Sequence, residues 1–119
     1  MIVLHLPYPP TLNHMYGVQR SGRRFIKAPG VLFKKRVAEI VAEQKIVTLN
    51  GQLCVFITAY MPDKRRRDLM NLEKITNDAL TKAGVWLDDF QIDDFQIVRG
   101  KLLKGGKLVV VITEIKAKK

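Results

Sequence analysis

Four cations in a row are followed directly by a carboxylate in the middle of the chain. Lys64, Arg65, Arg66 and Arg67 precede Asp68 in the segment MPDKRRRDLMNLEK. Ammonium and guanidinium groups bind phosphate oxygens, and carboxylate oxygens are the ligands that hard metal ions prefer. This combination indicates a site for a nucleic-acid phosphodiester with a metal ion beside it.

A second group of carboxylates, Asp88, Asp89, Asp93 and Asp94, follows later in the chain. If the loop that carries Asp88 and Asp89 returns to the beginning of the intervening helix, these carboxylates and Asp68 could share Mg²⁺. Aspartate is also common at helix N-caps and in turns, so Asp68 could be a cap and the others turn residues. The residue types leave both interpretations open.

Two further residues lie on the polar face of the helix that is expected after Asp68. Lys74 lies opposite the apolar stripe of this helix and could reach a phosphate near the helix start, or it could be a solvated lysine. Met70 shares the polar face, which is an unusual position for a large apolar side chain. Either Met70 packs on a partner or a loop, or it has replaced a polar residue.

The N-terminal half of the chain carries most of the positive charge. The net charge is +10, and residues 1–67 hold twelve Lys and Arg against three Asp and Glu. Arg23, Arg24 and Lys27 lie in a Gly-rich loop and alternate with aromatic residues, as in surfaces that bind nucleic-acid strands. The asymmetry favours a polyanionic partner, although solubility or a ribosome-like RNA contact would also explain a basic chain.

Length and composition exclude several other classes of protein. A chain of 119 residues is long enough for one domain with a single core. Cys54 is the one cysteine, which excludes an internal disulfide and a zinc cluster and fits a reducing, cytoplasmic compartment. The apolar start reaches Pro7 after six residues, far short of the roughly 18 needed to span a bilayer, so no membrane segment is expected.

Hydrophobic periodicity predicts an α+β fold, a two-layer mixed β-sheet covered by two helices. Asp68 is the expected N-cap of the second helix, and Gly84 is expected to end it. The expected elements are a strand over 2–6, a basic loop or irregular hairpin over 11–30, a helix over 31–47, a central strand over 53–60, a helix over 68–83, strands over 92–101 and 107–115, and a frayed tail over 116–119.

Several of these segments together resemble one known family. The runs LPYPPTLNHMY, MPDKRRRDL, NLEK, DALTKAGVWLDD and KGGKL are similar, in order and spacing, to the RusA family of Holliday junction resolvases. The resemblance covers nearly the whole chain, which implies a single RusA-like endonuclease domain over 1–119. It also implies a homodimer that cuts four-way DNA junctions symmetrically in recombination and repair, with Mg²⁺, or alternatively Mn²⁺, as cofactor.

The resemblance assigns roles to residues that the pattern alone left open. It implies catalytic roles for Asp68, Lys74 and Asp89, and metal binding by Asp68 and Asp89 with Asp88 adjacent. It also implies DNA contacts from the arginine run. The full set of expected nucleic-acid-binding residues is Lys64, Arg65, Arg66, Arg67, Arg23, Arg24 and Lys27.

The chain departs from the family pattern at Met70, where the family has the second Asp of its D-L-D motif. A thioether is a soft, uncharged group and does not replace a carboxylate on Mg²⁺. Three explanations stay open: an inactivated site, a site completed by another carboxylate such as Asp88, Asp93 or Asp94, and weak activity with fewer ligands. The alternatives to an active resolvase are therefore a catalytically impaired junction-binding protein and, in another class, a basic RNA-binding domain.

Overall fold

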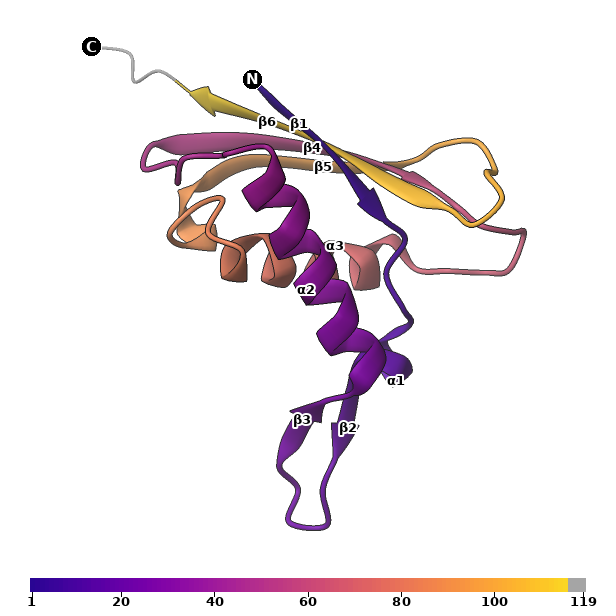
Figure 1. The fold of residues 1–119 in the computed structure, drawn as a ribbon. Helices are drawn as coiled ribbons and strands as arrows, with labels where there is room; N and C mark the ends of the chain where they lie inside the picture. Colours follow the sequence, from indigo (N-terminus) through magenta and orange to yellow (C-terminus); the bar gives the residue numbers. More distant parts are fainter. Residues whose placement is uncertain (116–119) are drawn as a thin grey trace.

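A four-stranded mixed sheet forms one layer of the fold, and two helices cover one of its faces (Figure 1). A computed structural model describes residues 1–115, so the expected frayed tail over 116–119 lies outside the described residues. The strands follow the spatial order β1-β6-β4-β5, in which β4 and β5 are parallel and the other pairs antiparallel. The expected α+β class is confirmed. The strands are β1 (Ile2–Pro7), β4 (Gln52–Tyr60), β5 (Ile92–Arg99) and β6 (Lys107–Ile115).

The covering helices are α2 (Ala28–Glu43) and α3 (Leu69–Lys82), whose apolar stripes pack on the inner face of the sheet. Helix α2 begins earlier than the expected residue 31 because Pro29 fits the first turn, where its missing N–H needs no partner. It also ends earlier, because Lys45 has a φ of 54°, which interrupts a right-handed helix. None of the helices in the described part of the chain is long and apolar enough to cross a membrane.

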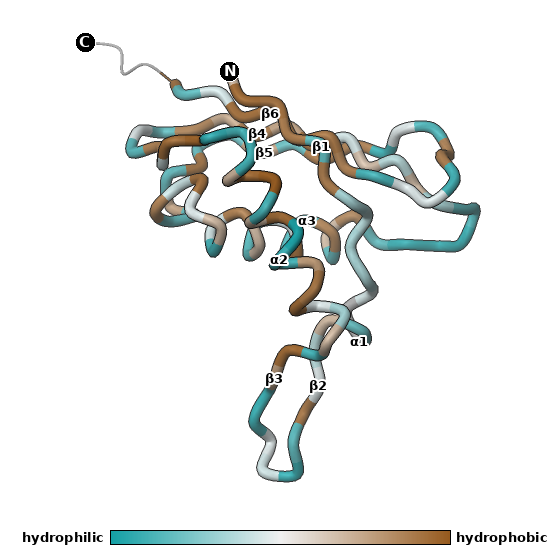
Figure 2. The backbone as a smooth tube through the Cα atoms, in the orientation of Figure 1, coloured by the Kyte–Doolittle hydropathy of each residue, from teal (hydrophilic) through white to brown (hydrophobic). Residues whose placement is uncertain are grey.

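A small arm projects from the helical side of the molecule (Figure 1). It consists of the one-turn helix α1 (Leu12–Met15) and the two-stranded sheet of β2 (Tyr16–Val18) and β3 (Arg24–Ile26). The expected basic loop therefore contains a short hairpin. Figure 2 shows that the tip of this arm is hydrophilic, whereas the strands and helix faces that meet in the body are hydrophobic.

The unit β4–α3–β5 determines where the acidic segments lie. Helix α3 begins beyond the end of β4 and runs back to the beginning of β5, which is the crossover that two adjacent parallel strands require. The short 3-10 helix η1 (Asp89–Gln91) joins α3 to β5. Gln91 is buried, and its amide nitrogen donates to the carbonyls of Leu49 and Gly51, each at 2.9 Å. These bonds hold η1 against the beginning of β4.

Two loops extend side by side beyond the end of the sheet at which β4 and β5 finish (Figure 1). One joins β4 to α3 and the other joins β5 to β6. The Leu103 N–H donates to the Met61 carbonyl at 2.9 Å, and the Gly100 N–H donates to the Ala59 carbonyl at 2.9 Å. β5 ends at Arg99, two residues before the expected end, and the chain then enters this loop.

Helix α3 ends in a Schellman motif, as the glycine at position 84 predicts. The Gly84 N–H donates to the Thr81 carbonyl at 3.1 Å, and the Val85 N–H donates to the Leu80 carbonyl at 3.2 Å. Gly84 has a φ of +84°, the left-handed region that residues with a Cβ rarely adopt. The position would otherwise accept a methyl group, because an added Cβ would lie 3.8 Å from the nearest heavy atom, the Thr48 Oγ1.

We expect Gly84→Ala to lower the free energy of unfolding by about 1–2 kcal/mol, the cost of one left-handed residue with a side chain. Urea denaturation followed by circular dichroism measures it. Gly51→Ala is the matched control, because its Cβ would also meet an ordinary contact at 3.8 Å and Gly51 has no positive φ. Equal losses in the two variants would contradict the role of the Schellman motif.

Candidate functional site

The carboxylate of Asp68 is exposed at the beginning of α3, next to the cation run. Asp68 is the N-cap, and its Oδ1 accepts a hydrogen bond from the Met70 N–H at 2.9 Å. The cap fixes the orientation of the carboxylate, and the helix dipole favours negative charge at this position. The second oxygen, Oδ2, is free of protein partners within the described residues. Both uses of Asp68 considered from the sequence, a cap and a metal ligand, are therefore compatible.

Arg67 differs from its neighbours in the cation run, because its guanidinium is held inside the loop. Nη1 and Nη2 donate to the two carboxylate oxygens of Asp63 at 2.5 and 3.2 Å, and the side chain is 19% exposed. The guanidinium also lies 5.7 Å from the centre of the Tyr8 ring. The hydrogen bonds from Arg67 and from the Arg65 N–H lower the pKa of Asp63 to about 2. In the free protein Arg67 therefore orders the loop.

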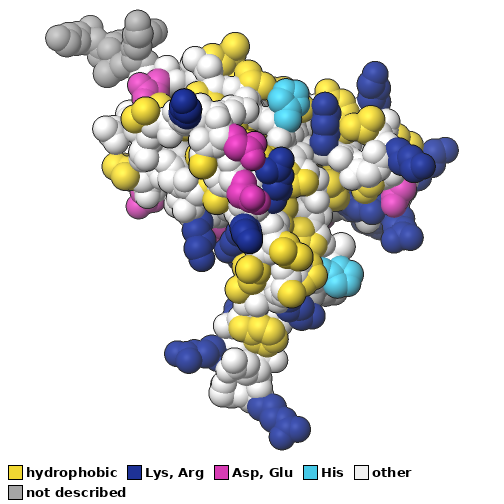
Figure 3. Space-filling model, viewed as in Figure 1, with side chains coloured by type: hydrophobic (Ala, Val, Ile, Leu, Met, Phe, Trp, Pro, Cys, Tyr) yellow, Lys and Arg dark blue, Asp and Glu magenta, His cyan; other side chains and the backbone are white. Residues whose placement is uncertain are grey.

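Lys64, Arg65 and Arg66 remain exposed and form the outer surface of this loop. The adjoining β5–β6 loop adds Lys101 and Lys104, which are also exposed. Figure 3 shows Lys and Arg side chains gathered at this end of the molecule and at the tip of the arm. Sequence reasoning missed the two lysines of the second loop, because only the pairing of the strands brings them beside residues far away in the chain.

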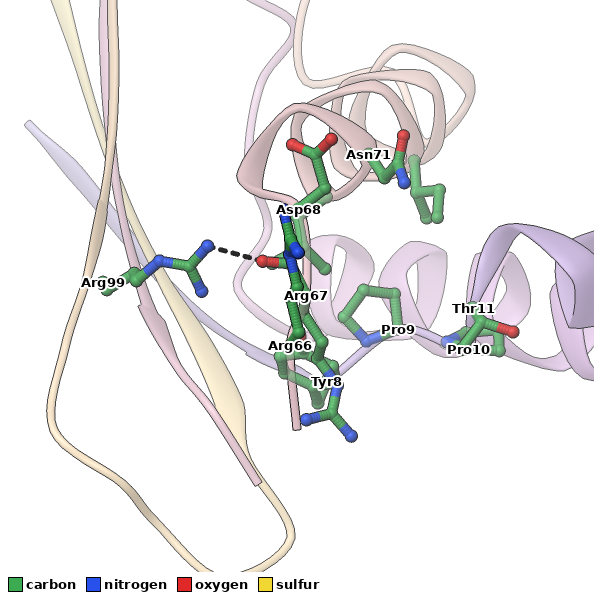
Figure 4. Close-up of a pocket in the computed structure, with 11 residues that line it drawn as sticks. Tyr8, Pro9, Pro10, Thr11, Arg66, Arg67, Asp68, Asn71 and Arg99 are labelled. Carbon is green, nitrogen blue, oxygen red and sulfur yellow. Dashed lines mark hydrogen bonds between the residues drawn. The ribbon is translucent and has the colours of Figure 1, made fainter. Parts of the chain in front are cut away.

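A cavity of about 570 Å³ opens beside Asp68; we call it the Asp68 cavity. Figure 4 shows the side chains of Asp68 and Asn71 projecting from the first turn of α3 above Tyr8 and Arg66. Arg99 reaches the same place from the end of β5, and its Nη2 donates to the Arg67 carbonyl at 2.5 Å. The lining residues are Tyr8, Pro9, Pro10, Thr11, Arg66, Arg67, Asp68, Asn71, Leu72, Ile75 and Arg99.

Asp88 and Asp89 lie at the other end of α3. Asp88 is the N-cap of η1, and its Oδ1 accepts from the Phe90 N–H at 3.0 Å. The Asp89 Oδ1 lies 3.2 Å from the Thr81 hydroxyl, which also accepts from the indole N–H of Trp86 at 2.7 Å. The single proton of this hydroxyl also lies within reach of the Asn77 carbonyl, at 2.8 Å. Thr81 therefore links Asp89 to Trp86, which is 1% exposed, through a contact that Asp89 shares with Asn77.

The return of the Asp88–Asp89 loop to the beginning of α3, which a metal site shared with Asp68 would need, does not occur within one chain. Thr81, which contacts Asp89, lies thirteen residues after Asp68 along a straight helix. At about 1.5 Å of rise per residue, the two carboxylates are about 20 Å apart. Among the described residues, no group of three His, Cys, Asp or Glu side chains could hold a metal ion.

Asp93 and Asp94 also lie far from Asp68. They are exposed near the beginning of β5, where Asp94 pairs with Cys54. Burial and, to a lesser extent, the charge of Asp94 raise the pKa of the Cys54 thiol. Strand β4 runs six residues from Cys54 to Tyr60, about 20 Å, before the chain turns toward α3. These two carboxylates do not replace the missing carboxylate at Met70 within one chain.

Lys74 is exposed on α3 and lines a second cavity of about 300 Å³ together with the arm. The Arg24 guanidinium lies 5.6 Å from the centre of the Tyr16 ring, and burial raises the pKa of that tyrosine. Arg23 is exposed beyond this contact, whereas Lys27 is half-buried at the base of the arm. The arm thus presents part of the expected basic surface on the same side of the molecule as Lys74.

The chain is similar to known endonucleases along most of its length. Residues 7–113 match the family described as Endodeoxyribonuclease RusA. The chain is 44% identical over 111 residues to the crossover junction endodeoxyribonuclease of Enterobacteria phage 82. It is 43% identical over the same length to the proteins with that name from Escherichia coli strain K12 and Shigella sonnei. Each comparison covers 92% of this chain and 92% of its relative.

A match of this extent places the cation run, α3, Gly84 and η1 inside the shared region. The resemblance that the sequence motifs indicated is confirmed. The chain belongs to the RusA family of endodeoxyribonucleases.

Proposed function

We propose that this chain is a homodimeric, divalent-cation-dependent endonuclease that resolves four-way DNA junctions in recombination and repair. The observation that carries the proposal is the exposed Asp68 carboxylate beside a surface of exposed cations, in a chain whose relatives are named crossover junction endodeoxyribonucleases. The cations would bind the phosphates of the junction arms, and Asp68 would lie at the scissile phosphate. Mg²⁺, or alternatively Mn²⁺, is the proposed cofactor.

The donor set fits a hard cation if two subunits contribute to each site. Asp68 has a free carboxylate oxygen, and Asp89 is exposed with only one oxygen in a hydrogen bond. Because these groups are about 20 Å apart in one chain, we propose that Asp68 of one subunit and Asp89 of the partner subunit hold the ion, with Asp88 adjacent. Two antiparallel copies of α3 about a twofold axis form two such sites, one for each cut.

Exposed apolar side chains at both ends of α3 support this arrangement. Met70, near Asp68, is 73% exposed, and Leu87 and Phe90, near Asp89, are 69% and 84% exposed. Within one chain these side chains form two separate groups, one at each end of α3, and neither group alone is a contiguous apolar patch. A second copy that joins the two carboxylates would also bring these side chains together and remove them from water.

The roles of the chain's own residues follow from their positions. The bound ion would polarise the scissile phosphate and lower the pKa of an attacking water. Asp68 is oriented by its cap bond, and Asp89 by the Thr81 contact, so the two carboxylates need little rearrangement to act as ligands. Lys74 lies six residues after Asp68, about 9 Å along the helix, where its ammonium can stabilise negative charge on the strand being cut.

A second candidate function is junction binding without cleavage, which Met70 favours. Its thioether occupies the exposed first turn where the family motif has a carboxylate, and it cannot bind Mg²⁺ as an oxygen ligand. DNA binding does not depend on this position, because the exposed cations lie in the loops that precede α3 and follow β5. Cleavage assays on synthetic four-way junctions with Mg²⁺ or Mn²⁺ distinguish the two functions.

A mixed dimer tests whether each site is shared between subunits. Asp68→Asn and Asp89→Asn should each abolish cleavage as homodimers. A heterodimer with one variant of each kind, purified through two different tags, retains one site with both carboxylates. We therefore expect it to make one nick per junction and few paired cuts, measured on end-labelled junctions.

The control is the heterodimer of Asp68→Asn with the double variant Asp68→Asn/Asp89→Asn, which has no complete site in any arrangement. An inactive mixed dimer of the two single variants, with DNA binding intact, would show that the sites are not shared in this way.

Substitution of Met70 tests the missing carboxylate. We expect Met70→Asp to lower the Mg²⁺ concentration needed for half-maximal cleavage by at least about tenfold, since even outer-shell partners alter metal affinity by about 10–100-fold. Met70→Leu, which keeps an apolar side chain, should leave this concentration unchanged. If the parent protein needs no more Mg²⁺ than Met70→Asp, another group already completes the site.

Arg66 is exposed and Arg67 is paired with Asp63, so we expect their substitutions to have different effects. Arg66→Ala should weaken junction binding and reduce the slope of log K against log salt by about 0.9, the loss of one phosphate contact. Arg67→Ala should mainly lower the urea midpoint of unfolding, because it removes the ion pair with Asp63. Arg36→Ala is the control, because Arg36 pairs with Glu43 on α2, outside the proposed surface. An unchanged salt slope for Arg66→Ala would contradict the proposed contact.

A further inference from the structure

The Asp68 cavity differs from a phosphate-binding surface, because it has an apolar floor. Pro9, Leu72 and Ile75 are buried at its base, and Tyr8 is half-buried beside them. A phosphate group alone would need no such floor, since its oxygens bind cations and N–H groups. The volume of about 570 Å³ is within the range of about 300–1,000 Å³ that small-molecule sites occupy. The cavity therefore suits a ligand with a flat apolar part.

The rim of the cavity is polar and mainly cationic. Arg66 and Arg99 are exposed at its edge, opposite Asn71 and Asp68 on α3 (Figure 4). One N–H of the Arg99 guanidinium binds the Arg67 carbonyl, and four of its five N–H groups remain for other acceptors. The Asn71 carboxamide offers both donors and an acceptor, the combination that recognises the edge of a nucleobase. An anionic ligand with a hydrogen-bonding planar group matches both the rim and the floor.

We propose that the Asp68 cavity binds one unstacked nucleotide of the DNA strand, next to the phosphate that is cut. This inference rests on the proposed function, because Asp68 marks the position of that phosphate. The base would lie against Tyr8, Pro9 and Pro10, and its edge would face Asn71. The flanking phosphates would lie on Arg66 and Arg99. Asn71 is then a residue that determines sequence preference at the cleavage site.

Unstacking a base costs a few kcal/mol in a regular duplex and less where pairing is already disturbed. At the point of strand exchange in a four-way junction the bases are paired, but the strands pass from one arm to another and the stack is interrupted, so a base there has less stacking to lose. Stacking of a base on an aromatic side chain offsets much of this cost. The cavity thus gives a physical reason why a branched substrate would be bound more productively than a linear duplex with the same sequence.

A fluorescent base detects the proposed unstacking directly. Junctions would carry 2-aminopurine, or pyrrolocytosine at cytosine positions, at one nucleotide at a time around the exchange point. The full-length protein would be added in EDTA, which prevents cleavage. We expect the fluorescence to rise several-fold at one position per strand and not at its neighbours, because a base taken out of the stack loses quenching by its neighbours.

Two variants of Asn71 separate the space in the cavity from the reading of the base. Asn71→Phe, at an exposed position, should fill the entrance and abolish the fluorescence rise while the urea midpoint stays unchanged. Asn71→Ala should keep the rise but reduce the difference in cleavage rate among the four bases at that position. Asn50→Phe is the matched control, because Asn50 is exposed and does not line the cavity.

The outcomes distinguish this inference from the proposed function. Junctions that are bound and later cut with Mg²⁺, but show no local fluorescence rise at any position, would overturn the inference and leave the function intact. A rise that Asn71→Phe does not remove would also overturn it. Suppression of the rise by an excess of free mononucleotide, without loss of junction binding, would show that the cavity accepts the nucleotide group itself. Failure to bind or cut any branched DNA would overturn the proposed function instead.

Discussion

The parallel pairing of β4 with β5 determines where every candidate catalytic group lies. Two neighbouring parallel strands need a crossover that carries the chain back to the end of the sheet at which both strands begin. Helix α3 is that crossover. A helix in this position begins where β4 ends and finishes where β5 begins. Asp68 and Asp89 are therefore kept near opposite ends of the strands. Bringing them together in one chain would require the strands to separate.

Different interactions hold the two ends of α3. At the first end, the Arg67 side chain pairs with Asp63 and lies over the Tyr8 ring, and the Arg67 carbonyl accepts a hydrogen bond from Arg99. These contacts tie the loop before Asp68 to the ends of β1 and β5. At the second end, the buried indole of Trp86 positions the Thr81 hydroxyl beside Asp89. Each carboxylate is exposed, whereas Arg67 and Trp86, which order the chain around it, are at least partly buried. This arrangement helps to keep a ligand in place before metal or DNA arrives.

Local signals in the sequence predicted the parts of the fold that local physics controls. Asp68 as an N-cap and Gly84 as the end of α3 were predicted because capping and left-handed backbone depend on single residue types. The apolar and β-branched residues of 53–60 similarly predicted a central strand. The position of Asp89 relative to Asp68 was not predictable in this way. It depends on the parallel register of β4 with β5, which joins segments about forty residues apart and leaves no local pattern.

The same limit explains why two members of the basic surface were missed and why Arg67 differs from its neighbours. Arg67 is chemically identical to Arg66, and only the nearby Asp63 carboxylate makes it a structural residue. Lys101 and Lys104 join the cation surface because the loop after β5 packs on the loop after β4. A run of cations predicts a surface for phosphates, but the pairing of loops decides which side chains are left free to bind them.

Met70 connects the proposed metal site with the proposed dimer. In the family motif a carboxylate at this position would add an oxygen ligand, whereas the thioether adds apolar surface at the same place. If Asp68 meets Asp89 of the partner subunit, Met70 lies close to Phe90 of the partner subunit, and a thioether packs favourably against an aromatic ring. The substitution would then strengthen contact between subunits at the expense of affinity for the ion. If the ion and the second subunit complete the same site, as proposed, a loss in one can be offset in part by a gain in the other.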